Sequence, residues 1–395
     1  MFDQDRGSNQ AGTRAYNERL VLSLVRRHDG LAKADIARST GLSPQTVSLI
    51  MRSLESDGLL RRGDPVKGRV GQPSVPMHLE AGGAFTIGLK IGRRSADLVL
   101  MDFAGTVRQR LNQFYPYPTP ETILSFAGNG VENLVASLPA SQRHKVAGIG
   151  VATPFQLWKW ADDVGVDPEK MASWRDADIA DQLGKRCGLP VYVQNDATAA
   201  CGAELIMGRG EALVDFVYFF VGFFVGGGIV LNNSVYSGRS GNAGAFGPMP
   251  VPSRDGGSRQ LIQEASIFTL ERQLQEEGAD PAVLWEDPAD WTALEPQLSA
   301  WIDRTATGLA HAIVASCAVV DFPAAIIDGG FPAHVRKAVV AQTRDAVSQL
   351  DLEGLQPLDI LEGSIGSHAR AIGGALLPFF DRYLADQNVL FKQSA

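Results

Sequence analysis

Cysteine is scarce in this sequence, and the placement of the few cysteines excludes two kinds of framework. The chain of 395 residues contains three, Cys187, Cys201 and Cys317, which stand far apart and form no Cys-x-x-Cys pair. This spacing excludes a disulfide scaffold and offers no thiolate set to a structural zinc ion. We therefore expect no metal site, and a reducing, cytoplasmic location.

Long apolar runs are also missing. The strongest candidate for a membrane segment, FVYFFVGFFVGGGIVL at 216–231, has sixteen residues without a charge. A spanning helix needs about 20 residues, and the triple glycine at 226–228 would break one. We expect two buried strands joined at a glycine turn, and no membrane partner. The start, MFDQDRGSNQ, lacks a basic segment followed by an apolar run, so no secretory signal is expected.

Positive charge is in deficit over the whole chain but not in its first part. Residues 1–80 contain twelve Lys and Arg against nine Asp and Glu, a net charge of +3, whereas the whole chain carries −8, so residues 81–395 carry −11. A basic segment on an acidic remainder indicates that only the first segment meets a polyanion.

The basic segment has the pattern of three short helices. Apolar residues recur at helical spacing within 16–28, a second helix is expected at 32–39, and Gly41 and Leu42 form a turn. Ser43-Pro44 then starts a third helix, because serine caps a first turn and proline suits the first helical position. Its buried face contains Val47, Ile50, Met51 and Leu54.

A glycine- and proline-rich hairpin follows the third helix. The run LLRRGDPVKGRVGQPSVPMHL after Gly58 predicts a strand, a tip and a returning strand, which is typical of a β-wing. Together these elements predict a winged helix-turn-helix, with the third helix in the major groove and the wing along a minor groove. A charged hairpin beside a helical domain that binds protein is the alternative. The expected DNA contacts are Lys33, Ser43, Gln45, Thr46, Ser48, Arg52, Lys67, Arg69 and Gln72.

From Ala84 onward, short apolar runs alternate with helical segments, which is typical of α/β domains. Strands are expected at FTIGLKI, ADLVLMDF, VAGIGVA, VYVQND, FVYFFV, GGIVLNN and AAIIDGG. Helices are expected at 120–138, 177–187, 196–206, 265–277, 301–318, 332–350 and 367–383.

Two motifs, PVYVQNDATAACGAE and GFFVGGGIVLNNSVYSGRSGNAGAFG, are placed between a glycine hairpin and IIDGG. These motifs and their order resemble the ROK family of sugar kinases and sugar-responsive repressors. The resemblance spans Tyr16 to Tyr383 and implies an actin-like, ribonuclease H-like two-lobed α/β fold. Because the kinases of the family lack a DNA-binding head, it also implies the repressor branch. The expected domains are a flexible arm (1–14), a winged helix-turn-helix (15–80), a first lobe (84–197), a second lobe (198–366) and a C-terminal helix segment (367–395) that packs back on the first lobe.

The phosphate motifs of the family are altered in this chain. In the family's kinases the first hairpin reads Asp-x-Gly-x-Thr, whereas Lys90 stands here in place of the acid, followed by Arg93 and Arg94. The second loop, Gly-Thr-Gly-x-Gly-Gly-Gly in the family, has Phe223 and Phe224 in place of a hydroxyl and a glycine. Such side chains would obstruct the β- and γ-phosphates of ATP, so we expect no cofactor and no catalytic residue.

The cations of this first hairpin, Gly88 to Gly105, leave two interpretations open. In one, Lys90, Arg93 and Arg94 bind the phosphate of a sugar phosphate. In the other, which we favour, they pair with acids of the −11 body across the cleft between the lobes.

The sugar side of the family's site is partly kept. Asn195 and Asp196 match the family's Asn-Asp pair, for which the resemblance implies that the carboxylate accepts hydrogen bonds from sugar hydroxyls. A helix cap at Asp196 is the alternative. Ala245 and Pro248 stand where the family has the glutamate and histidine of Ala-Gly-Glu-x-Gly-His, and the cysteine-rich zinc loop that follows is absent. The expected ligand-binding residues are Asn195, Asp196 and Glu264.

These observations lead to one leading hypothesis and two alternatives. The leading hypothesis is a transcriptional repressor of carbohydrate-related genes, whose non-catalytic body senses a sugar or sugar phosphate. Its body would form a homodimer or homotetramer on a palindromic double-stranded operator. A sugar kinase with an unusual nucleotide site, resting on Asp196, is one alternative. A ligand-independent regulator whose body only dimerises, resting on Ala245 and Pro248, is the other.

Overall fold

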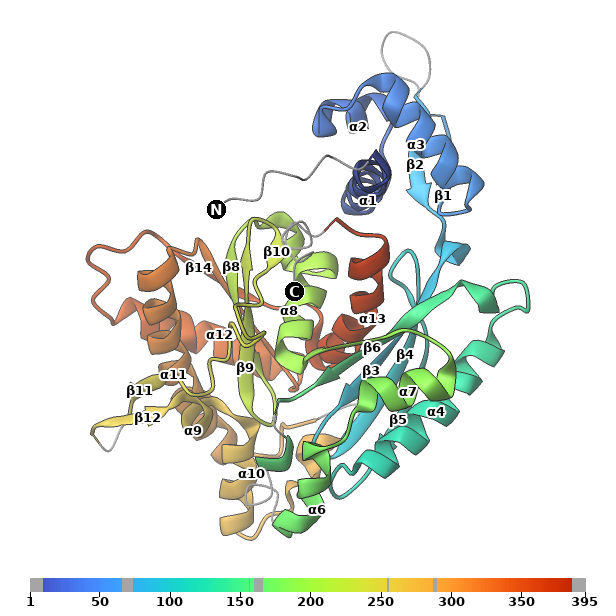
Figure 1. Ribbon diagram of the computed structural model, residues 1–395. Coiled ribbons are helices and arrows are strands. Elements are labelled where there is room, and N and C mark those ends of the chain that lie inside the picture. Colours follow the sequence, from blue (N-terminus) through green and yellow to red (C-terminus); the bar gives the residue numbers. More distant parts are fainter. Residues whose placement is uncertain are drawn as a thin grey trace, which may run out of the picture.

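The computed structural model describes residues 10–65, 74–155, 157–159, 166–253, 256–286 and 290–385. A small N-terminal head stands on a body with two lobes, each built around a five-stranded sheet. In Figure 1 the head is blue and lies above the red C-terminal helix, and the two lobes lie below it on either side. Two helices, α8 (Asp196–Met207) and α13 (Ala369–Arg382), run between the two sheets.

Three helices and a two-stranded ribbon make up the head. They are α1 (Gln10–Arg27), α2 (Lys33–Thr40), α3 (Pro44–Ser56), β1 (Leu60–Arg62) and β2 (Met77–Leu79). Gly41 ends α2 in the left-handed region, and the Ser43 hydroxyl caps α3 by accepting a hydrogen bond from the Thr46 N–H at 3.1 Å. The expectation of an arm is wrong for residues 10–14, because this stretch contains no proline and continues α1 toward the N-terminus.

The first lobe is a mixed sheet covered by helices on both faces. Its elements are β3 (Phe85–Ile91), β4 (Ser95–Asp102), β5 (Val107–Phe114), β6 (Val146–Thr153), β7 (Val191–Asn195), α4 (Pro120–Ser137), α6 (Pro168–Ala172) and α7 (Ile179–Cys187). The strand order is β5-β4-β3-β6-β7, with β3 antiparallel to β4 and parallel to β6. α4 and α7 cover one face. α13 covers the other, where Gly150 permits close packing because a Cβ there would overlap the Gly374 carbonyl oxygen.

The second lobe repeats this plan with different helices. Its elements are β8 (Phe216–Val221), β9 (Val225–Leu231), β10 (Ser234–Val235), β11 (Pro250–Pro252), β12 (Ser258–Gln260), β13 (Ala324–Gly329), β14 (Asp359–Glu362), α9 (Leu261–Ala265), α10 (Ile267–Glu276), α11 (Gln297–Val320) and α12 (Ala333–Ser348). The main sheet has the order β10-β9-β8-β13-β14. Val217 and Phe219 of β8 pack toward α11 and α12, whereas Tyr218 and Phe220 pack toward α8, so β8 is buried on both faces.

The uncharged run at 216–231 forms two antiparallel strands, β8 and β9, as its composition predicts. The turn lies at 222–224, however, and the triple glycine lies inside β9. A Cβ at Gly227 would overlap the carbonyl oxygen of Tyr218, so this glycine serves the close approach of two strands and not the turn. In the part of the chain that the structure describes, no helix is both long and apolar enough to cross a membrane.

Candidate DNA-binding surface and effector cleft

α3 presents one apolar face to the head and one polar face to solvent. Val47 and Met51 are buried against α1 and α2, and the helix is anchored at its start by the Ser43 cap. The opposite face exposes Gln45, and Leu49 is 64% exposed. An exposed leucine beside an amide suits a helix that enters a major groove, where apolar atoms contact thymine methyl groups and amides reach base edges.

Six of the nine expected DNA contacts lie on or beside α2 and α3, and each of the six is exposed or half-buried. Lys33 is exposed at the start of α2; Ser43, Gln45 and Arg52 are exposed on or beside α3, and Thr46 and Ser48 are half-buried there. Lys67, Arg69 and Gln72 lie outside the described residues. The stem of the wing is present, because β1 pairs antiparallel with β2.

The head is docked on the body through a shared apolar core. Val21 and Val25 of α1 belong to one buried cluster with Phe103 of the first lobe and Phe379 of α13. The rings of Phe103 and Phe379 meet edge to face, with centroids 5.4 Å apart. Burial of each such side chain contributes about 1.5–3 kcal/mol, so α1 is held as part of the body and not on a loose linker.

A cavity of about 200 Å³ lies between the two lobes at the start of α8. Asn195 caps α8 by accepting hydrogen bonds from the N–H groups of Ala197 and Thr198. The main cap of this helix is therefore Asn195, and not Asp196 as the alternative interpretation of that residue had it. The Asp196 carboxylate faces the cavity and pairs with Arg370 of α13 at 3.3 Å. The Arg370 guanidinium also lies 5.0 Å from the centre of the Phe220 ring, which fixes it beside the carboxylate.

The arginines of the first hairpin close the cleft by pairing across it. Arg93 and Arg94 lie 3.3 Å and 2.8 Å from the Glu271 carboxylate of α10, and we name these three residues the cross-lobe bridge. Arg93 also lies over the Phe223 ring at 4.5 Å, and the Trp285 indole N–H donates to Glu271 at 2.9 Å. The expected pairing across the cleft is therefore confirmed for both arginines.

Lys90 behaves differently from the two arginines. Its ammonium pairs with Asp97 at 2.8 Å, on β4 of the same hairpin, so a pairing across the cleft is wrong for Lys90. The antiparallel register places Lys90 directly opposite Asp97, which explains this choice of partner. Burial works to raise the pKa of Asp97, but the ion pair with Lys90 holds that pKa below its usual value.

Glu264 does not line the cavity at Asp196. It is buried on α9, where Ile262 and not Glu264 lines the cavity. The Cβ of Glu264 lies beside Gly308 of α11. Its nearest cation is Arg259, at 3.9 Å. The structure thus brings Asn195 and Asp196 together and leaves Glu264 apart from them. Ala245 and Pro248 do line the cavity, and neither side chain can bind a metal ion.

Comparison with known protein families agrees with this architecture. The ROK family matches residues 86–378, and a winged helix-turn-helix DNA-binding domain matches residues 14–61. The chain belongs to the ROK family. The ROK chain thus combines a winged helix-turn-helix of the DNA-binding kind with the sugar-kinase-like α/β body of that family.

Individual relatives extend over most of the ROK chain. The uncharacterized protein y4fQ of Sinorhizobium fredii is 27% identical over 369 residues, which cover 92% of this chain and 91% of that protein. The xylose repressor of Bacillus subtilis is 22% identical over 244 residues, 62% of each chain.

Two solved structures show the same fold. A ROK family transcriptional regulator described as a homolog of the E. coli MLC protein has a TM-score of 0.64 at 19% identity, over 92% of this chain and 96% of that one. A ROK family glucokinase from Streptomyces griseus, in complex with glucose and AMPPNP, has a TM-score of 0.57 at 22% identity, over 74% and 99%.

Sequence reasoning missed two residues that shape the cleft of this ROK protein. Arg370 and Glu271 stand 174 and 177 positions from their partners Asp196 and Arg94. No local motif surrounds either residue, so only the folded arrangement of the lobes identifies them.

Proposed function

We propose that this ROK protein is a DNA-binding transcriptional regulator, of the repressor type, that controls carbohydrate-related genes. The observation that carries the proposal is the exposed polar face of α3 on a winged helix-turn-helix, joined to a sugar-kinase-like body. The name of its relative, the xylose repressor, supports a sugar-linked set of target genes.

We further infer that the body binds a ligand without phosphorylating it. Phosphoryl transfer needs open backbone around the phosphates and acidic side chains for the metal ion. In this chain Phe223 and Arg93 stack in the phosphate region, and Lys90 with its partner Asp97 replaces the acid. The Asp196 carboxylate, which would act as base, is occupied by Arg370. These residues do not fit an ATP–magnesium complex, which supports a non-catalytic body.

The effector we propose is a sugar or sugar phosphate in the cavity at Asp196. A sugar hydroxyl would donate to the Asp196 carboxylate and would compete with Arg370 for it. Two copies of the protein on a two-fold axis would place two α3 helices in successive major grooves of a palindrome. A change in the angle between the lobes would then change the spacing of the heads and the affinity for the operator.

Genome-wide mapping of bound DNA tests the regulator and names its operator. Binding to no defined set of sites would overturn the proposal. Operator affinity is then measured with a panel of pentoses, hexoses and their phosphates. We expect one of them to change it at least fivefold, and the Asp196→Asn variant to lose that response. The matched control is Asp181→Asn, an exposed residue on α7 whose partner is Lys185 and not a cleft residue.

A kinase assay on the same proteins tests the non-catalytic body. We expect no turnover when the protein is incubated with ATP, Mg²⁺ and the same sugars. Turnover that Asp196→Asn abolishes and Asp181→Asn preserves would establish a kinase instead.

A further inference from the structure

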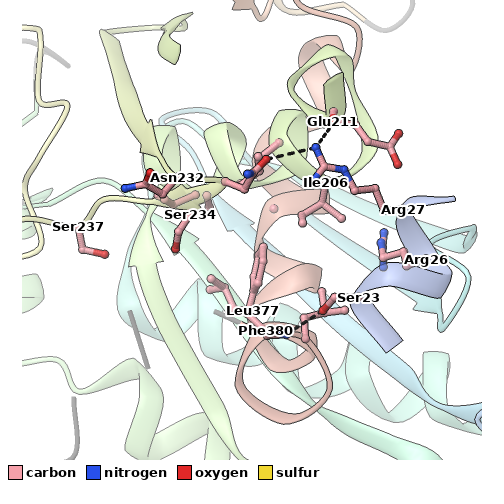
Figure 2. A pocket seen from close by; sticks show the side chains of 18 of the residues that line it. Ser23, Arg26, Arg27, Ile206, Glu211, Asn232, Ser234, Ser237, Leu377 and Phe380 are labelled. Atoms are coloured by element: carbon pink, nitrogen blue, oxygen red, sulfur yellow. Dashed lines mark hydrogen bonds between the residues drawn. The ribbon is translucent and has the colours of Figure 1, made fainter. Parts of the chain in front are cut away.

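A second cavity, larger than the one in the cleft, lies between the DNA-binding head and the body. It measures about 350 Å³ and is walled by α1 on one side and by α8, α13 and the β9–β10 turn on the other (Figure 2). Among the described residues, Thr198 alone borders both cavities. This cavity could not be predicted from local sequence patterns, because its walls come from separate segments of the chain.

The walls of this head–body cavity divide into an apolar part and a polar part. The apolar part consists of side chains from three helices: Leu20, Leu24, Ile206, Leu377 and Phe380. Polar groups come from the turn after β9, from β10 and from the segment that follows it: Asn232, Ser234 and Ser237. Drug-sized ligands occupy pockets of roughly this size, with mainly apolar walls and a few polar groups that fix orientation.

One charged group in the wall lacks a partner. Nε of Arg26, on α1, is buried and makes no hydrogen bond within the described residues. Burial lowers the pKa of Arg26 to about 10, although Glu211 and Asp102 act to raise it, so the guanidinium is desolvated and still charged at neutral pH.

Glu211 and Asp102 attract Arg26 through their charge, but neither of them accepts a hydrogen bond from its buried Nε. Asp102 is paired with Arg108 at 2.8 Å. The neighbouring Arg27 donates to the backbone oxygen of Glu211 at 2.9 Å and to Oδ1 of Asn233 at 3.3 Å, which ties α1 to the body. Two arginines and one glutamate leave the wall with a surplus of one positive charge. A buried cation in this position favours an anionic ligand.

We propose that the head–body cavity is a second ligand site, which takes a small organic monoanion with an apolar body. The anionic group would lie beside Arg26, and the apolar part would lie against Leu377 and Phe380. Because α1 of the head forms one wall, a ligand that fits one position of the head better than another would change operator affinity. This last step rests on the proposed function, whereas the binding itself does not.

The binding is tested with 1-anilinonaphthalene-8-sulfonate, an apolar monoanion that fluoresces in dry sites, on the full chain. We expect one saturable site. N-phenyl-1-naphthylamine, which has the same rings without the sulfonate, should bind at least tenfold more weakly. Arg26→Met should remove this preference for the anion. Leu20 of α1 lines the cavity but does not belong to the apolar core between head and body. The larger side chain of Leu20→Trp should fill the cavity and weaken the binding of both probes at least tenfold.

Three controls make the result decisive. Arg19→Met is the same substitution on α1 at a residue that does not line the cavity, and Asp181→Asn alters an exposed acid of α7 that lines neither cavity. Both should leave the probe affinities unchanged, and circular dichroism should show all variants folded. Equal affinity for the two probes, or full binding to both Arg26→Met and Leu20→Trp, would overturn the site.

Operator affinity at saturating sulfonate probe tests the coupling separately. We expect a shift of at least threefold in wild type and none in Leu20→Trp. Probe binding without any shift would refute the coupling while leaving the site in place. Absence of any DNA binding would refute the proposed function and not the site.

Discussion

Replacing Glu271 by glutamine removes the charge that holds Arg93 and Arg94 while it keeps the shape of the side chain. The Glu271 side chain is 3% exposed and that of Arg93 is 9% exposed, so this half of the cross-lobe bridge is buried. Removal of one partner of a buried ion pair costs about 3–5 kcal/mol, because the other charge stays buried. Arg94 is 34% exposed and contributes less, since water screens it. Glutamine can still accept the hydrogen bond from Trp285, and stacking on Phe223 still favours Arg93. We therefore expect Glu271→Gln to lower the free energy of unfolding by about 3 kcal/mol, the lower end of this range.

Urea unfolding followed by tryptophan fluorescence measures this loss. The matched control is Glu276→Gln on the same helix, whose ion pair with Arg272 at 3.5 Å is exposed on both sides and should matter by less than about 0.5 kcal/mol. Because the bridge joins the two lobes, the first unfolding transition of the variant should move to a lower urea concentration. If the lobes separate before they unfold, the dependence of the unfolding free energy on urea concentration should also be less steep for that transition. A loss below about 1 kcal/mol, or a loss equal to that of the control, would refute the claim that this bridge holds the cleft closed.

Four further substitutions test the head and the pairing of β8 with β9. Gln45→Ala should change base preference at one operator position by about 1–3 kcal/mol, whereas Arg69→Ala should weaken all sequences alike and lower the salt slope by about one. Systematic operator variants at several salt concentrations separate the two, and unchanged binding in both would exclude this placement of helix and wing. Arg27→Ala removes two hydrogen bonds between α1 and the body and should raise hydrogen exchange in α1 with little loss of stability; unaltered exchange would show that the apolar core alone holds the head. Gly227→Ala should yield little folded protein, because its Cβ overlaps the Tyr218 carbonyl oxygen, and normal expression with an unchanged melting temperature would contradict that overlap.

The strands that sequence reasoning found and missed differ in their burial. β3, β8 and β13 are buried on both faces and appear in the sequence as continuous apolar runs. β5 is an edge strand in which five of eight residues are exposed, and its mostly polar sequence VRQRLNQF shows no continuous apolar run. β14 has four residues, too few to show a period. A single sequence therefore predicts well those strands that are buried on both faces of the sheet.

The candidate sites divide in the same way. Ser43 could be identified because its chemistry is local: it caps the helix that follows it. Asn195 could be found only through the family's Asn-Asp motif, and the cap that it provides is the one considered for its neighbour Asp196. Pairing of the hairpin arginines with an acid could be expected from the charge of the body, but the sequence does not say that the acid is Glu271. Choice of partner depends on how the lobes pack, and that information is spread over the whole chain.

The two cavities are linked by the same pair of helices. α8 begins at Asp196 in the cleft, borders the head–body cavity from Thr198 onward and still lines it at Ile206, about 15 Å from Asp196 along the helix axis. α13 begins beside Arg370 in the cleft and reaches the head–body cavity with Phe380. A sugar that separates Asp196 from Arg370 would therefore act on the first turns of both helices. The last turns of these helices hold α1, since Phe379 shares its core. A small displacement in the cleft would then be transmitted to the head through these packed helices, without a flexible linker. An anion beside Arg26 would act on the same joint from its other end, so the two ligands would alter one another's affinity by the same factor.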